Sequence, residues 1–147
     1  MLVVHPRLGD FRGAPVRGVR ALLALLRVRL VLAEDELDSP HARYFAERVE
    51  IARPERLEES WPRLRRFVDA HPIDAVFAQT EAGLLLGALA ARHAGVRGIS
   101  IQAAHACTNK YVSRVTLAAQ RVPQPEFALV SSESEARAFA DVHGYPV

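Results

Sequence analysis

The sequence has one cysteine, one lysine and no long apolar run. The scarcity of cysteine and the lack of a long apolar run each exclude a class of protein. A single thiol, Cys107, cannot build the internal disulfide framework of a small secreted domain. The longest apolar run, over residues 82–91, is about half of the roughly 20 residues that a membrane-spanning helix needs. The first residues show no basic leader before an apolar core, so we expect a cytoplasmic protein without a membrane partner.

Acidic and basic residues are nearly balanced, with 19 Lys and Arg against 17 Asp and Glu among 147 residues. A nucleic-acid-binding chain normally concentrates a basic excess in one region. The densest basic group, Arg63, Arg65 and Arg66, has acidic residues on both sides and is typical of a solvated helix face. We therefore expect no nucleic-acid partner. Lys110 is the sole lysine, since every other basic residue is Arg.

Apolar periodicity in the first hundred residues alternates between strand and helix. Short apolar or alternating segments predict strands over residues 2–5, 28–33, 48–52, 73–78 and 98–102. Helical spacing appears over 15–26, 54–70 and 82–93, with Pro62 expected to kink or break the second helix. The strand over 73–78 is nearly all apolar, which indicates a central position. This order predicts an α/β fold with a mostly parallel sheet flanked by helices on both faces.

Ligands of such sheets bind outside the carboxyl ends of the strands. The polar residues predicted there are candidates for a substrate site: Gln79, Thr80, Glu81, Gln102 and His105. Taken one by one, each fits better as a polar loop residue that satisfies the end of a helix. The sequence has no H-E-x-x-H or C-x-x-C spacing, no nucleophile elbow and no phosphate loop, so it predicts no metal ligand and no catalytic residue.

The pattern changes after residue 102. A helix over 109–120, a proline-rich link, a strand over 126–130 and a helix that opens with a capping box follow one another. Their motifs stand in an order that resembles the entry into an ATP-grasp domain: Asn109-Lys110, Val122-Pro123-Gln124-Pro125, Ser132 to Glu135, and Gly144-Tyr145-Pro146-Val147. Two positions depart from that frame, since Asn109 replaces an acidic residue and Arg121 replaces a glycine.

The resemblance implies a Rossmann-like pre-ATP-grasp domain over residues 1–104 and the truncated helix–strand–helix start of an ATP-grasp domain over 105–147. The full-length ligase would use ATP and Mg²⁺ to activate a small carboxylate as an acyl phosphate, which an amine or similar nucleophile then attacks. Lys110 matches the first phosphate-facing lysine of the family, although a solvated surface lysine is an equal alternative. The amino-acid ligase branch fits best, and a biotin-carboxylase-like relative remains open.

The chain ends on an apolar tripeptide after a helix, which indicates a piece of a longer protein. We expect this piece alone to be inactive and to bind no nucleotide tightly. We also expect the missing part to leave apolar surface exposed, through which copies could associate. The rival interpretation is a non-catalytic Rossmann-like module that binds a small molecule or another protein.

Overall fold

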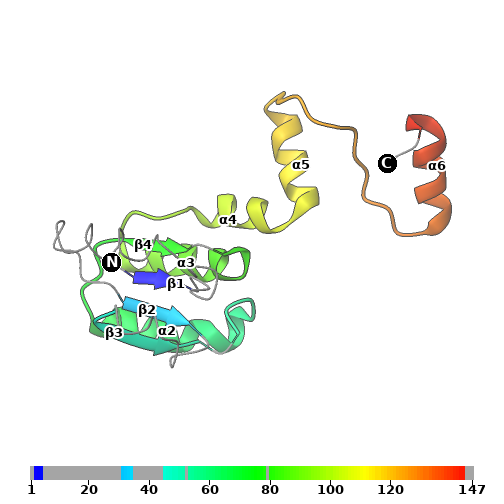
Figure 1. Cartoon of the computed structure of the whole chain (residues 1–147). Helices are drawn as coiled ribbons and strands as arrows, with labels where there is room; N and C mark the ends of the chain where they lie inside the picture. Colours follow the sequence, from blue (N-terminus) through cyan, green and yellow to red (C-terminus); the bar gives the residue numbers. More distant parts are fainter. Residues whose placement is uncertain (1, 5–30, 35–44, 52, 79, 145–147) are drawn as a thin grey trace, which may run out of the picture. The chain divides into compact units, whose positions relative to one another are not determined.

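The computed structural model describes residues 2–4, 31–34, 45–51, 53–78 and 80–144. The chain divides into two units, Met1–Thr108 and Asn109–Val147. The family resemblance implies a boundary four residues earlier, between residues 104 and 105. The first unit contains the sheet, and the second is built from helices joined by an extended segment (Figure 1). The expected mixture of helices and strands is therefore present.

Four parallel strands form one sheet in the order β3-β2-β1-β4 (Figure 1). They are β1 (Leu2–Val4), β2 (Val31–Glu34), β3 (Glu47–Glu50) and β4 (Val76–Ala78). Leu2 on β1 lies opposite Val31 on one side and Val76 on the other, so β1 has a ladder on both edges. The prediction that residues 73–78 form a central strand is wrong for the described sheet, because β4 lies at its edge. The apolar character of β4 reflects contact with the core through Val76 and Ala78, whereas Phe77 is 52% exposed.

Two helices, α2 (Leu57–Ala70) and α3 (Glu81–Ala94), contact each other and share one core with the strands. Leu2 and Val4 alternate along β1 and are both fully buried, as the two-residue period of a strand requires. The other buried members of this core come from β3, from the residue that follows it and from the two helices: Val49, Ile51, Leu64, Val68, Leu86 and Ala90. The helix predicted over 15–26, on which a second covered face depends, lies outside the described residues.

Helix α2 begins three residues after Pro54, where the sequence pattern placed its start. The hydroxyl of Ser60 donates to the carbonyl of Arg53 at 2.6 Å and holds the preceding turn against the helix. Arg56 precedes the helix and bonds to Glu59 at 2.8 Å, and this contact raises the pKa of the guanidinium. The helix continues through Pro62, so the predicted break is wrong. Packing of the apolar face offsets the one backbone hydrogen bond that a proline removes.

Helix α3 ends where the sequence predicts. Gly95 adopts the left-handed conformation, with φ 68°, and its N–H bonds back to the last turn. In the middle of the helix, Gly87 lies so close to β4 that a β-carbon at this position would stand 2.8 Å from the Ala78 β-carbon. Glycine is therefore required here by the close approach of backbone to backbone.

The fifth strand predicted over 98–102 is absent. The chain makes one isolated parallel bridge, Ala75 to Arg97, and then enters α4 (Ile101–Thr108). The side chain of Ser100 accepts a hydrogen bond from the Ala103 N–H at 3.1 Å, so it caps this helix. The alternating apolar pattern of this segment therefore does not predict its backbone.

The second unit contains α5 (Lys110–Ala119) and α6 (Glu133–His143). The link between them is anchored on α5, because the Gln124 side chain donates to the Arg114 carbonyl at 2.8 Å and the rings of Phe127 and Tyr111 meet edge to face. The strand predicted over 126–130 is wrong, since these residues have no ladder partner among those described.

The Ser132 cap predicted at the start of α6 is present, and Glu135 reaches back to the N–H of the residue before the cap. Ser132 accepts from the Glu135 N–H at 3.3 Å, and Glu135 accepts from the Ser131 N–H at 2.6 Å. Little of this unit is buried: among its described residues only Ala140 is enclosed. Most of the exposed large apolar side chains of the described chain belong to it: Tyr111, Val115, Val122, Leu129, Val130 and Val142. No helix in the described part of the chain has both the length and the apolarity needed to cross a membrane.

Replacing Gly87 with valine should destabilise the first unit. The added methyl groups would overlap Ala78 and force α3 away from β4, at a cost of about 1–3 kcal/mol in unfolding free energy. Arg92→Val is the matched control, because Arg92 is an exposed residue of the same helix. Urea unfolding followed by far-UV circular dichroism measures both variants. Equal losses in the two variants would show that the close approach contributes nothing to stability.

Candidate functional site

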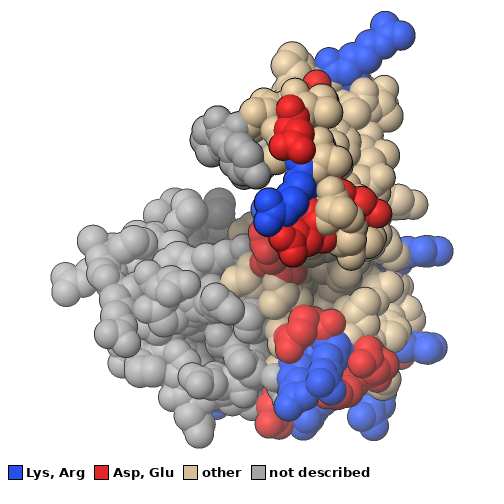
Figure 2. Space-filling model, turned by 90° about the vertical axis from the view of Figure 1, so that its right-hand side faces the viewer, with Lys and Arg blue, Asp and Glu red and all other residues tan. Residues whose placement is uncertain are grey.

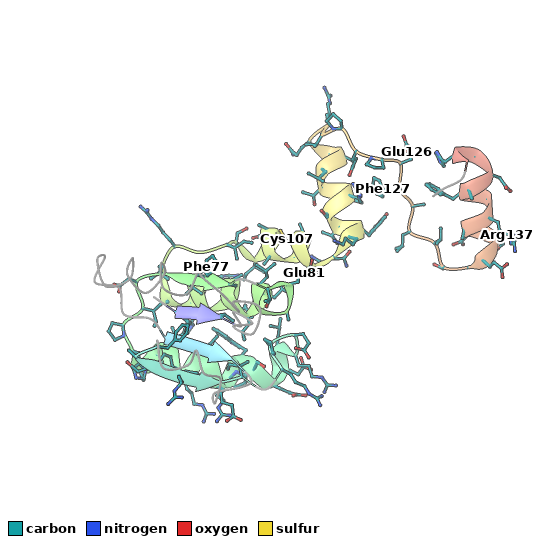
Figure 3. All side chains as sticks on the ribbon, viewed as in Figure 1. Phe77, Glu81, Cys107, Glu126, Phe127 and Arg137 are labelled. Carbon is teal, nitrogen blue, oxygen red and sulfur yellow. The ribbon has the colours of Figure 1, made fainter. Side chains whose placement is uncertain are left out.

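The carboxyl edge of the sheet is formed by the ends of the four parallel strands. β2 ends at Glu34, β3 at Glu50 and β4 at Ala78. The chain passes from β4 into α3 through Thr80, which is half-buried and extended, and Glu81, which is exposed in the first helical turn. Glu81 lies at the end of the sheet toward which the strand arrows point (Figures 1 and 3). Gln79 lies outside the described residues.

Gln102 and His105 do not follow a strand, because the fifth strand is replaced by α4. Both are exposed on this helix, three residues apart, which places them on one helical face. Ala104 is buried, and α4 packs against α3. Four of the five candidates thus lie in the first unit. Thr80 and Glu81 stand at the start of α3, and Gln102 and His105 lie on α4.

Lys110 is the first residue of α5 in the second unit, and its side chain is exposed. The Asn109 side chain accepts from the Val112 N–H at 3.0 Å, so the first turn of the helix is closed by a neutral cap. Lys110 forms no side-chain hydrogen bond or ion pair with another described residue. A lysine at this end opposes the helix dipole, which favours anions there. The ammonium and the helix end therefore present positive charge together.

Two histidines without a predicted role lie beside carboxylates in the first unit. His93 on α3 bonds to Asp69 on α2, and His71 at the end of α2 bonds to Glu47 on β3. No sequence signal reveals these pairs, because each partner lies more than twenty residues away from its histidine. Among the described residues, no three His, Cys, Asp or Glu side chains gather where they could hold a metal ion. Cys107 is an exposed free thiol on α4 (Figure 3).

Charges of both signs are interspersed on the face that Figure 2 shows, where basic side chains lie next to acidic ones. Several of the arginines are paired on or beside α2: Arg56 with Glu59, Arg63 with Glu50, and Arg65 with Asp69. These pairs are about half exposed, so each contributes at most about 1 kcal/mol to stability. The arginine-rich group of α2, Arg63, Arg65 and Arg66, thus lies on an exposed helix face, as the sequence indicated, and two of its members are paired with carboxylates.

Comparison with known proteins gives a likeness in structure and none in sequence. No family model matches the chain, and no curated protein matches it. Among solved structures, the chain is similar to an L-amino acid ligase from Bacillus licheniformis, with a TM-score of 0.72 and 17% identity. The match covers 91% of this chain and 33% of the ligase chain, so this chain spans about a third of that protein's length. The likeness shows that the chain shares the fold of that part of the ligase.

The Asn109 cap should control how firmly the first turn of α5 is formed. Asn109→Ala removes the acceptor for the Val112 N–H and should destabilise that turn by about 1 kcal/mol, whereas Asn109→Ser keeps an acceptor. Amide hydrogen exchange at residues 111–113, measured by NMR, should accelerate roughly fivefold in the alanine variant alone. Identical exchange in the alanine and serine variants would show that the cap does not hold Lys110 in place.

Proposed function

We propose that this chain is the amino-terminal portion of an ATP-dependent ligase of the ATP-grasp type. Residues 1–104 would form its Rossmann-like first domain, and residues 105–147 would begin the nucleotide-binding domain. The complete enzyme would join a small carboxylate to an amine. The observation that carries this proposal is the likeness in fold to an L-amino acid ligase, which extends over 91% of the chain.

The first unit supports the proposal through its sheet. A parallel sheet presents all carboxyl ends of its strands at one edge, where α/β proteins bind small ligands. Thr80 and Glu81 lie at that edge, at the start of α3. In the proposed enzyme these residues border the site of the carboxylate substrate. Gln102 and His105 on α4 are the further candidates of the same unit.

The chemistry of such a ligase requires positive charge on the transferred phosphoryl group. A carboxylate oxygen of the substrate attacks the γ-phosphorus of ATP, and ADP leaves; the amine then attacks the acyl carbon, and phosphate leaves. Charge on the phosphoryl oxygens is stabilised by cationic side chains and by Mg²⁺. Lys110 suits this role because its ammonium is exposed, lacks an ion-pair partner among the described residues and lies at the positive end of α5.

No described cluster of carboxylates can hold Mg²⁺. In this proposal the metal ligands and the remaining phosphate contacts belong to the part of the ligase that this chain does not span. Lys110 then acts on the nucleotide only together with those groups, and a single ammonium in water binds a phosphate weakly.

The 147-residue chain should therefore bind ATP only weakly. Isothermal titration calorimetry with MgATP should give a dissociation constant in the millimolar range or weaker, since one exposed cation offers about 1 kcal/mol of electrostatic attraction in water. Micromolar binding would contradict the proposed division of the site between this chain and the rest of the ligase.

The same lysine should matter greatly in the complete protein, expressed with its downstream codons. Lys110→Ala should lower amino-acid-dependent phosphate release from ATP by roughly tenfold or more, because a phosphate-facing charge is lost. Lys110→Arg should retain part of the activity. Arg137→Ala on α6 is the control, since Arg137 is exposed and paired with Glu133. Unchanged activity in Lys110→Ala would remove Lys110 from the site, and a reading frame that stops after Val147 would favour a non-catalytic module.

A further inference from the structure

The two halves of the second unit carry charges of opposite sign. Residues 109–125 contain three basic side chains and no acidic one: Lys110, Arg114 and Arg121. Residues 126–144 contain four acidic side chains and a single arginine, Arg137. The acidic side chains are all exposed: Glu126, Glu133, Glu135 and Asp141. The half that contains α5 is therefore cationic, and the half that contains α6 is anionic.

Both helices expose apolar side chains beside these charges. On α5, Tyr111 and Val115 are four residues apart and so lie on one face, where they are 41% and 43% exposed. On α6, Val142 directly follows Asp141 and is 78% exposed. Apolar side chains that are rimmed by charged ones mark surfaces that bind other proteins.

Neither helix has much packing inside its own unit. The two helices have 10 and 11 residues, and helices of this length are marginal in water without tertiary packing. α5 has no buried residue, and Ala140 is the only buried residue of α6. The link contacts α5 through Gln124 and Phe127, but no extensive contact joins α6 to α5. The exposed faces of both helices thus have no cover among the described residues.

A second copy of the chain carries the complement of both faces. The cationic α5 of one copy can pack on the anionic α6 of the other, and a two-fold axis repeats this contact with the roles exchanged. A pairing of α5 with α5, or of α6 with α6, would instead oppose like charges, which is unfavourable at an interface. The exchanged pairing covers both apolar faces and neutralises both charged ones.

We propose that two copies of this chain associate through their second units, with α5 of each copy packed against α6 of the other. The charge complementarity of the two halves selects this pairing, and the exposed apolar side chains supply the surface that it buries. This proposal is independent of the ligase function.

Charge reversal in two separate variants tests the pairing. Lys110→Glu with Arg121→Glu reverses the charge of the α5 half, and Glu126→Lys with Asp141→Lys reverses that of the α6 half without touching the cap of α6. Each variant alone opposes like charges and should self-associate at least about tenfold more weakly than the unaltered chain. An equimolar mixture of the two variants should associate again, because each α5 then meets an α6 of opposite charge.

Sedimentation velocity between about 10 µM and about 300 µM measures the association, since the share of dimer grows with concentration. Arg66→Glu with Arg92→Glu is the matched control. It changes the net charge of the chain as much as the α5 variant does, but on exposed residues of the first unit, and it should leave the association unchanged.

A mixture of the two variants that remains monomeric would overturn the proposal, and so would self-association of either variant at the strength of the unaltered chain. An unaltered chain that is monomeric over the whole range would overturn it as well and would leave both faces to a different partner. If a variant fails to fold, the unaltered chain decides the question. Its backbone amide NMR shifts should change on dilution in α5 and α6, and changes confined to the first unit would refute the pairing.

Discussion

The close approach of α3 to β4 is the constraint on which the first unit depends. Gly87 brings the helix backbone against Ala78, and Gly98 passes even closer to Ala91 after the helix ends. Through these contacts α3 holds the edge strand, packs on α2 and supports α4. Because α3 begins directly after β4, the same approach determines where Thr80 and Glu81 lie at the carboxyl edge of the sheet. The small residues of α3 thus determine how the candidate site residues lie at the carboxyl edge of the sheet.

Elements with a local signal were predictable from the sequence. Gly95 ends α3 because a left-handed residue favours glycine, and Ser132 starts α6 because its hydroxyl satisfies a helix N–H. Arg121, which follows the C-cap of α5, is left-handed as well, with φ 55°. These signals act within four residues, so no knowledge of the tertiary structure is needed to read them.

The two predicted strands that the structure lacks had no such local signal. Residues 98–102 and 126–130 both show the composition of a strand, but a strand exists only where another strand pairs with it. After one bridge at Arg97, the cap from Ser100 favours a helix, and Phe127 packs on Tyr111 of α5 instead of entering a ladder. The same error affected the prediction of the candidate site. Gln102 and His105 were predicted to lie at the end of a strand, and both lie on α4. The carboxylate partners of His71 and His93 were unpredictable because they are distant in sequence.

The charge at the start of α5 sets this helix apart from the other long helices described. Acidic residues occupy the first turn of α2, α3 and α6, where they oppose the positive end of the helix dipole: Glu58 and Glu59, Glu81, and Glu133 with Glu135. The first turn of α5 has none, its cap is the neutral Asn109, and its first residue is a cation. The lack of acidic residues and the cation at Lys110 cost helix stability, whereas the Asn109 cap contributes to it, and together the three features leave the attraction of this helix end for an anion in place. An aspartate at the position of Asn109 would offset the positive potential at Lys110, and the neutral asparagine leaves that potential in place.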